Sequence, residues 1–286
     1  MTIPNTPKIA LIGFGEAGHA FATGWGPALA PRLCAYDIKV LQTGVTEHGL
    51  VCHATPQAAL AGASIALCLV TADQALAAAQ TCAPQLPPAM IWLDGNSCAP
   101  DTKRRAAEVI EAAGGRYVDM AIMAPVHPHL HRTPALLSGP HAGAAISALA
   151  GFDMALTLAG SAVGDASTIK MLRSVMVKGF EALTAECLLA ARRAGVEEAV
   201  LASLQASDPG WNIRQRGSYN LERMLVHGQR RAAEMREVAL TLRDLGLPDR
   251  MAAAAADWQD ELGGLGIAAG PDDLAQRMDT VLGALP

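Results

Sequence analysis

The sequence predicts an α/β protein, in which an N-terminal Rossmann domain with a doubly wound parallel sheet precedes an all-α C-terminal domain. Three observations support this prediction. In the first half, short apolar runs alternate with helical stretches of about 10–15 residues, a pattern typical of βαβ units. A glycine-rich turn directly follows the first apolar run. From Asp165 onward, runs that resemble strands stop and the pattern is helical only.

The strands of the first half are expected where short apolar runs end in polar or glycine-containing turns. These runs are Lys8–Ile12, Arg32–Tyr36, Gly49–His53, Ser64–Val70, Met90–Leu93, Arg116–Asp119, Pro134–Ser138 and Asp153–Ala159. Helices are expected between them, beginning near Glu16 and Thr55 and covering Asp73–Cys82 and Pro100–Ala113.

The second half consists of alanine-rich stretches, and alanine has the highest helix propensity. Breaks are expected at Asp208-Pro209-Gly210, Gly246-Leu247-Pro248 and Gly270-Pro271. We therefore expect two domains, an NAD(P)-binding Rossmann domain at residues 1–162 and an all-helical substrate and dimerisation domain at residues 163–286.

Composition limits the classes of function. Of the 286 residues, 51% are hydrophobic and 17% are charged, so the chain can bury a large core. The formal net charge of −5 argues against a general nucleic-acid binder, because neutralising phosphates requires a surplus of Lys and Arg. We expect a small-molecule substrate and no nucleic-acid partner.

The six cysteines are scattered and have no spacing suited to zinc, so we predict no metal site and buried thiols in a reducing compartment. No run approaches the ~18–20 apolar residues that a membrane-spanning helix needs. The first residues lack the basic and apolar regions of a secretory signal. We therefore expect a cytoplasmic protein without membrane association.

The glycine-rich turn matches the dinucleotide-binding pattern in its context as well as in its letters. It follows an apolar strand and opens a helix, whose N-terminal N–H groups favour phosphates. Its first glycine permits a tight turn, the second allows the pyrophosphate to approach, and the third allows close packing of helix and strand. The motif reads Gly13-Phe14-Gly15-Glu16-Ala17-Gly18.

An acidic residue stands at the expected place after this motif. Asp37 ends the second predicted strand, 19 residues after Gly18. Its carboxylate is expected to accept the adenosine ribose hydroxyls and to repel a 2′-phosphate, which favours NAD over NADP. Lys39 is a counter-signal, so NADP remains the alternative.

One polar stripe is predicted in the second domain. Lys170, Ser174 and Lys178 are spaced at i, i+4 and i+8 and are followed by Glu181, so all four share one helix face. Most stripes of this kind are solvated faces. The neighbouring residues are apolar or small, however, and they favour a central helix with an active-site lysine.

Four blocks of the sequence resemble the β-hydroxyacid dehydrogenase family, which includes 3-hydroxyisobutyrate and 6-phosphogluconate dehydrogenases. The glycine motif is the first block, and Asp94-Gly95-Asn96-Ser97 with Pro100 is similar to a segment that lies by the nicotinamide in that family. The third is Tyr117-Val118-Asp119 before a loop. The fourth, Gly164 to Lys170, is similar to the segment that contains the family's catalytic lysine.

The chain departs from the family on the substrate side. The loop Met120–Pro125 lacks the family's Ser-Gly-Gly substrate anchor, and Arg173 and Ser174 replace the asparagines that follow the lysine. The later Lys-Asp-Leu motif is also altered. The pattern resembles a divergent, phosphogluconate dehydrogenase-like branch, although the chain is too short for the large helical domain of 6-phosphogluconate dehydrogenase.

The resemblance implies hydride transfer between the nicotinamide and a hydroxyl-bearing carbon, with a lysine as general acid or base. Lys170 is our first candidate, and Lys178 is the alternative proton carrier or a second cation that lowers the pKa of its neighbour. Ser174 is expected to position the substrate oxygen. Further cofactor contacts are expected at Val70, Thr71, Asn96 and Ser97, and substrate contacts at Met123, His127 and Arg231.

Two of these substrate contacts have competing interpretations. His127, His129 and His131 alternate in one loop, for which an exposed polar loop and a metal site are alternatives to a substrate contact. Arg231 lies in a helical stripe with His227, Arg230 and Glu234, for which a surface charged face is the alternative to an anion-binding patch.

The sequence thus predicts an NAD(P)-dependent dehydrogenase of small hydroxyacids or related polar alcohols. The alternatives are an imine reductase, which usually lacks the active-site lysine, and an NAD(H)-binding protein whose catalytic groups have decayed. A homodimer is expected, because an apolar helical domain with a long first helix would leave a large exposed patch.

Overall fold

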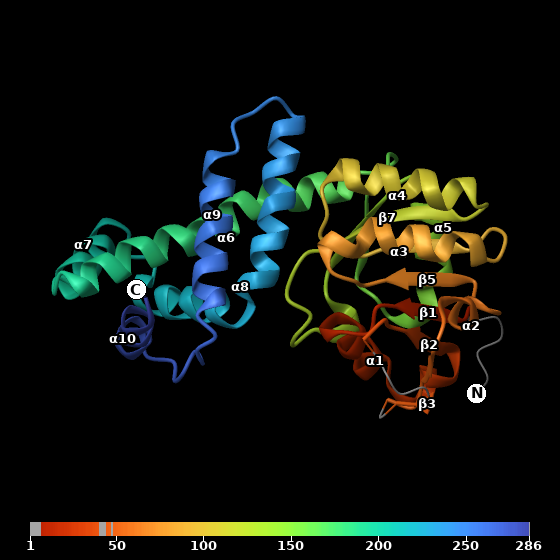
Figure 1. Ribbon diagram of the computed structural model, residues 1–286, viewed down its shortest axis with the longest axis horizontal. Coiled ribbons are helices and arrows are strands. Elements are labelled where there is room, and N and C mark those ends of the chain that lie inside the picture. Colours follow the sequence, from red (N-terminus) through yellow and green to blue (C-terminus); the bar gives the residue numbers. More distant parts are fainter. Residues whose placement is uncertain (1–6, 40–43, 47, 286) are drawn as a thin grey trace. The chain divides into compact units, whose positions relative to one another are not determined.

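The computed structural model describes residues 7–39, 44–46 and 48–285. The chain forms two compact units that divide between Met171 and Leu172. This division lies inside the long helix α6 (Asp165–Arg193), whereas the sequence led us to expect a domain boundary near residue 162. Figure 1 shows the sheet and its helices in the first unit and a helical array in the second.

Within the described residues, the first unit contains one nine-stranded sheet in the order β3-β4-β2-β1-β5-β6-β7-β8-β9. Neighbouring strands are parallel except at β3–β4 and β7–β8. The strands are β1 (Ile9–Ile12), β2 (Leu33–Tyr36), β3 (Gly44–Val45), β4 (Val51–His53), β5 (Ile65–Cys68), β6 (Ile91–Asp94), β7 (Arg116–Ile122), β8 (Ala135–Ser138) and β9 (Leu156–Gly160). The predicted α/β class, with its parallel N-terminal core, is confirmed.

Helices cover both faces of this sheet, as a doubly wound fold requires. They are α1 (Glu16–Leu29), α2 (Pro56–Leu60), α3 (Ala75–Cys82), α4 (Pro100–Ala112) and α5 (Ala142–Ala148). Successive residues of β1 point to opposite faces, so Ile9 and Leu11 pack with α1 and α5, while Ala10 and Ile12 pack with α2, α3 and α4. Because both faces are buried, the central strands are continuous apolar runs.

The described residues of the second unit form helices joined by loops and contain no strand, as predicted. After α6 it contains α7 (Glu197–Ser207), α8 (Ile213–Asp244), α9 (Arg250–Gly264) and α10 (Leu274–Ala284). Its core is built from leucines and methionines of these helices, among them Leu188, Leu221, Met224 and Met278. None of the described helices is long and apolar enough to cross a membrane.

Candidate cofactor-binding and active site

The glycine-rich loop connects buried strand β1 to helix α1 at the centre of the sheet. Gly13 adopts φ +94°, a conformation that favours glycine, and a Cβ atom there would lie 2.7 Å from the carbonyl oxygen of Leu69. Its N–H donates to the Tyr36 carbonyl at 2.8 Å. Gly13 is therefore required by both backbone conformation and space.

The remaining residues of the motif form the start of α1. Gly15 precedes the helix, and a Cβ atom there would meet nothing within 4 Å. At Gly18, by contrast, a Cβ atom would lie 3.0 Å from the Gly13 carbonyl oxygen. Glu16 and Ala17 begin the first turn, where backbone N–H groups have no carbonyl partner within a helix. The loop thus leaves open space beside a helix N-terminus, an arrangement that suits a pyrophosphate.

Asp37 is tied directly to this loop. Its Oδ2 accepts a hydrogen bond from the Phe14 N–H at 2.7 Å, and its Oδ1 accepts one from the Lys39 N–H at 2.7 Å. Each carboxylate oxygen has a second lone pair, so both can still accept ribose hydroxyls. The carboxylate therefore shapes the loop in addition to marking the expected ribose position.

The end of β5 lies beside the end of β1, and the end of β6 lies beside that of β5. The Val70 side chain lies next to the loop, with Cγ1 2.9 Å from the position of a Gly13 Cβ, and Thr71 precedes a short 3₁₀ turn. Beyond β6, the Asn96 side chain donates to Asp94 Oδ1 at 2.7 Å, while its buried Oδ1 has no partner among the described residues. The carboxyl ends of strands at a switch in strand order are the usual place for a ligand in an open α/β sheet.

Lys170 reaches the loop that follows β6. Its Nζ donates to Ser97 Oγ at 2.6 Å, across 73 positions of the sequence. Both residues belong to the first unit, and the Lys170 side chain is partly buried. The structure therefore brings together two residues that the sequence predicted independently, one in each of two motifs.

The polar stripe of α6 is buried and is not the solvated face that such stripes usually form. Ser174, Lys178 and Glu181 are each at most 5% exposed. Lys178 Nζ lies 2.8 Å from Glu234 Oε2 on α8, so the charge of its ammonium is matched by a carboxylate. This pairing weakens the hypothesis that Lys178 acts as a second, unmatched cation or as the proton carrier.

Arg231, which the sequence led us to expect either on a surface charged face or in an anion-binding patch, is buried. Arg231 is only 8% exposed, and its guanidinium pairs with the carboxylate of Glu181, which also accepts from Gln259 Nε2 at 2.8 Å. The residue therefore lies in a buried ion pair and not on a surface charged face, and a contact with a substrate carboxylate stays a prediction. Spacing along α8 could not reveal that Glu181 of α6 supplies the partner.

The residues predicted in the loop after β7 differ in their surroundings. Met123 follows the last residue of β7, with its N–H donating to the Pro134 carbonyl at 2.8 Å, and His127 and His129 are exposed. His131 is buried beside Trp25 of α1, and burial, together with the charge of Arg132, lowers its pKa. No group of three metal-binding side chains occurs among the described residues.

Sequence reasoning missed a buried lysine beside the site. Lys103 of α4 is fully buried and contacts Asp94 at 2.9 Å. A signal was present, because Lys103 shares the helical spacing of Ala106, Ala107 and Ile110, which are all buried. A charged residue on the apolar stripe of a helix implies a buried partner.

Comparison with known proteins agrees with this architecture. Residues 8–144 match the NAD binding domain of 6-phosphogluconate dehydrogenase, and residues 191–262 match a domain of unknown function, DUF1932. A conserved hypothetical protein from Sinorhizobium meliloti 1021 is 35% identical, with 98% of this chain and 97% of that chain covered and a TM-score of 0.75. The chain belongs to the β-hydroxyacid dehydrogenase-like family.

Other solved structures share this fold. The conserved protein MTH1747, described as similar in structure to 3-hydroxyacid dehydrogenases, is 28% identical over 91% of this chain and all of that chain, with a TM-score of 0.66. Mycobacterium tuberculosis 3-hydroxyisobutyrate dehydrogenase has a TM-score of 0.73 at 12% identity, covering 96% of this chain and 99% of that chain. The latter likeness shows the fold alone.

One further relative matches only part of this chain. An uncharacterised 28.5 kDa protein of Methanothermus fervidus is 28% identical over 148 residues, which amount to 52% of this chain and 56% of that protein. The shared segment therefore spans about half of each protein.

Proposed function

We propose that the protein is an NAD-dependent dehydrogenase that transfers a hydride between the nicotinamide and a hydroxyl-bearing carbon of a small hydroxyacid or related polar alcohol. The contact between Lys170 Nζ and Ser97 Oγ at 2.6 Å is the observation that supports this proposal. It holds an amine at the carboxyl end of β6, where the family resemblance puts the nicotinamide.

The residues at the strand ends fit a dinucleotide. The open space at Gly15 can receive the pyrophosphate, and the buried Asn96 Oδ1 offers an acceptor to a ribose hydroxyl or a carboxamide N–H. Asp37 would accept the adenosine ribose hydroxyls and repel a 2′-phosphate, so NAD is favoured over NADP. Bound NAD would supply the hydride acceptor.

Lys170 would carry the proton that accompanies the hydride. A base within ~2.6–3.2 Å of the substrate hydroxyl must take this proton in the oxidation and return it in the reduction. Ser97 holds the Lys170 amine on the cofactor side of helix α6, and Ser174 follows one helical turn later to position the substrate oxygen. The absence of the Ser-Gly-Gly anchor from the loop after β7 leaves the acid-binding contact to other residues.

The decisive experiment measures reduction of NAD⁺ and NADP⁺ against a panel of hydroxyacids and sugar acids, with thermal-shift binding of each nucleotide in parallel. Lys170→Ala should lower kcat about 10²- to 10⁴-fold, the usual contribution of a general base, without changing the affinity for NAD⁺. Lys8→Ala, at the opposite end of β1, is the matched control and should leave kcat unchanged.

The competing functions give different results in the same screen. Turnover of imines but not of hydroxyacids, insensitive to Lys170→Ala, would identify an imine reductase. Binding of NAD(H) without turnover of either class would identify a binding protein. Reductive aminase from Aspergillus terreus shares the fold at 18% identity with a TM-score of 0.56, and the fold alone does not separate these functions.

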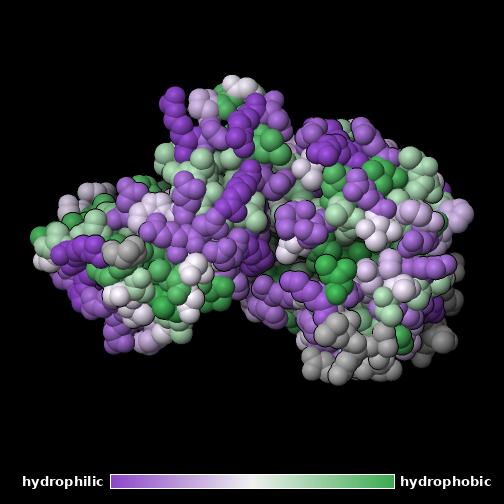
Figure 2. All heavy atoms as spheres, viewed as in Figure 1, coloured by the Kyte–Doolittle hydropathy of each residue, from purple (hydrophilic) through white to green (hydrophobic). Residues whose placement is uncertain are grey.

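We also propose that the protein forms a homodimer through the helical unit. On α6, Leu172, Met176, Phe180 and Leu183 are each at least 39% exposed and recur at helical spacing. Figure 2 shows hydrophobic surface among the polar side chains on the visible face of this unit. Contiguous exposed apolar rows of this kind mark association surfaces.

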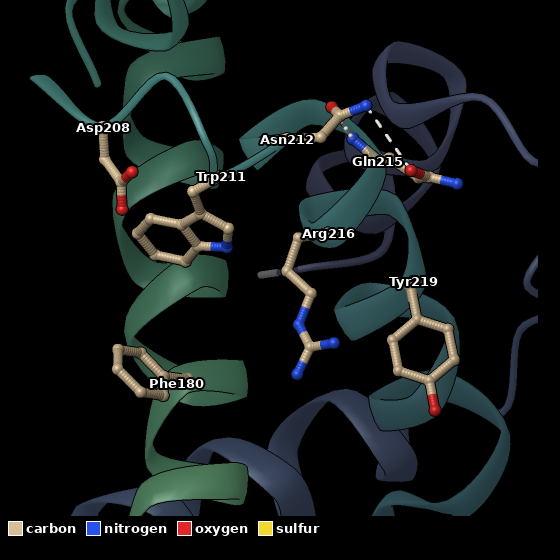
Figure 3. Close-up of a pocket in the computed structure, with 7 residues that line it drawn as sticks. All are labelled: Phe180, Asp208, Trp211, Asn212, Gln215, Arg216 and Tyr219. Atoms are coloured by element: carbon tan, nitrogen blue, oxygen red, sulfur yellow. Dashed lines mark hydrogen bonds between the residues drawn. The ribbon is translucent and has the colours of Figure 1, made fainter. Parts of the chain in front are cut away.

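A hollow of about 670 Å³ beside Phe180 supports a second copy as the occupant of this surface. Figure 3 shows Arg216 extending between Phe180 and Trp211 on one side and Tyr219 on the other, with Asp208 at the rim. Tryptophan, tyrosine and arginine are the residues enriched at interface hot spots. In a two-fold pairing, Arg216 of one copy can meet Asp208 of the other, so the patch is complementary to itself.

Light scattering after size-exclusion chromatography tests the dimer. The wild type should have twice the chain mass of 29.6 kDa, and Met176→Glu should shift it to the monomer. Leu247→Glu, an equally drastic change at an exposed position in the loop between α8 and α9, should remain dimeric. A monomeric wild type would overturn this proposal and leave the proposed reaction untouched.

A further inference from the structure

A buried group of charged and polar side chains lies beneath the predicted nicotinamide site. It consists of Asp94 at the end of β6, Lys103 on α4, and Tyr117 and Asp119 on β7, each at most 1% exposed. All four residues belong to the first unit. Placing three charges in a protein core is costly, so their contacts should show what this arrangement achieves.

Asp94 holds the loop that contains Asn96 and Ser97. Its Oδ1 accepts from the Asn96 N–H at 3.0 Å and from the Asn96 side chain at 2.7 Å. Its Oδ2 accepts from the Tyr117 hydroxyl at 2.7 Å. Burial, followed by the charges of Asp94 and Asp119, raises the pKa of Tyr117 well above its usual value, so this hydroxyl stays a donor.

Asp119 holds the start of helix α6. Its Oδ2 accepts from the backbone N–H groups of Gly164 and Ser167 at 3.2 and 2.9 Å, and from Ser138 Oγ at 3.2 Å. A carboxylate at this position satisfies backbone donors of the first helical turn and interacts favourably with the helix dipole. The helix that contains Lys170 is therefore anchored at Gly164 and Ser167, six and three positions before that lysine.

Lys103 lies between Asp94 and Asp119. Its ammonium donates to the Asp94 carbonyl at 2.6 Å and to Asp94 Oδ1 at 2.9 Å, and it lies 3.5 Å from Asp119 Oδ1. Burial alone would lower the pKa of Lys103, but the two carboxylates outweigh burial and raise it. The lysine thus stays charged and links the Ser97 loop to the N-terminus of α6.

We infer that Lys103 is a positioning residue, which sets the contact between Ser97 and Lys170 by fixing the loop and the helix that present them. The catalytic consequence rests on the proposed function, whereas the geometric one does not. The arrangement has a clear physical logic, since a single buried cation holds two acidic groups that would otherwise repel each other, and each acid fixes one of the two segments.

A double-mutant cycle on Lys170 reactivity tests this inference without requiring turnover. The rate of Lys170 acylation by acetic anhydride is measured by peptide mass spectrometry in the wild type, Ser97→Ala, Lys103→Met and the double variant, with the exposed Lys39 as internal reference. We expect each single change to alter the Lys170 rate at least threefold and the double variant to show no further change, because both remove the same contact.

The controls separate positioning from general loss of stability. Arg105→Met, the same type of change at an exposed position of α4, should leave the Lys170 rate unchanged. Tyr117→Phe removes only the hydroxyl and should produce a smaller change in the same direction, which keeps the test valid if Lys103→Met does not fold. Additive effects, or a wild-type rate in folded Lys103→Met, would overturn the inference.

Activity gives an independent readout. If the wild type turns over a hydroxyacid, Lys103→Met should lower kcat at least tenfold at a temperature where the variant is folded, while binding of ADP-ribose, which lacks the nicotinamide, stays within about twofold. If no substrate is turned over, the proposed function fails, and the acylation cycle still decides whether Lys103 positions Lys170.

Discussion

Gly15 in the first unit and Gly228 in the second serve opposite purposes. In the first unit, a Cβ atom at Gly15 would meet nothing within 4 Å. In the second, a Cβ atom at Gly228 of α8 would lie 2.3 Å from the Gln259 carbonyl oxygen and 2.7 Å from Gly263 Cα of α9. Gly15 leaves open space beside the N-terminus of α1. Gly228 allows the backbones of α8 and α9 to come into direct contact.

This difference shows which small residues point to a ligand. Gly228 and Gly263 let α8 and α9 approach closely, and their effect is complete in the folded chain. The space at Gly15 has no protein occupant, and it lies where phosphates are favoured. Substitution of a glycine at a close contact, such as Gly228, should lower the stability of the fold. Substitution of a glycine beside open space, such as Gly15, should weaken ligand binding. The predictions below test this division.

The largest effect is expected at the helix crossing. Gly228→Ala should lower the free energy of unfolding by about 2–3 kcal/mol, because backbone atoms on α9 cannot move aside as a flexible side chain can. Urea denaturation measures the change. Gly179→Ala on α6, where a Cβ meets nothing within 4 Å, is the matched control and should stabilise the helix by up to ~1 kcal/mol. Equal effects of both changes would contradict the close-contact explanation.

An intermediate effect is expected at the glycine-rich loop. Gly15→Ala should weaken NAD⁺ binding at least tenfold, about 1.4 kcal/mol, because the new methyl group occupies the space proposed for the pyrophosphate. Without nucleotide, the melting temperature should change by no more than ~4 °C, since the change from Gly to Ala at the helix N-cap costs up to about 1 kcal/mol.

Calorimetric titration with NAD⁺ measures this affinity, and Gly143→Ala on α5 is the control in equally open space. If Gly15→Ala binds NAD⁺ as tightly as the control does, the open space is not the cofactor site.

The smallest effect is expected at Asp37. Asp37→Ser removes the carboxylate that repels a 2′-phosphate and weakens its bond with the Phe14 N–H. The ratio of the NADP⁺ to the NAD⁺ dissociation constant should fall about tenfold, measured by titration with each nucleotide. Glu108→Gln, which removes an exposed carboxylate on α4, should leave the ratio unchanged. An unaltered ratio in Asp37→Ser would show that this residue only shapes the loop.

The sequence predicted most of the sheet, because apolar runs buried on both faces are visible without any partner. The predicted and observed strands differ at their ends, where pairing with a neighbouring strand or a preceding turn sets the boundary. Strand β7, for which the sequence predicted only the beginning at Arg116–Asp119, continues to Ile122, where it pairs antiparallel with β8. Strand β9 starts at Leu156 and not at Asp153, because Asp153 adopts φ +52° after a 3₁₀ turn. The two-residue strand β3 was not predicted.

The candidate site was predictable to different extents in the two units. Gly13, Asp37, Asn96, Ser97 and Lys170 belong to short motifs with fixed spacing, so the sequence shows them. In the second unit, Arg231 was expected at a surface or in an anion site, and the structure buries it against Glu181. Helical spacing gives the face on which a residue lies but not the helix that packs against that face.

The sequence by itself determined the α/β class, the helical second half, the glycine-rich loop and the lysine of α6, because each depends on local periodicity or on a motif of adjacent residues. Only the tertiary structure decided which charges are matched. The pairs of Lys103 with Asp94, Lys178 with Glu234 and Arg231 with Glu181 join residues 9, 56 and 50 positions apart. Such pairs form where elements pack and water is excluded, and this depends on the complete fold rather than on any segment of the chain.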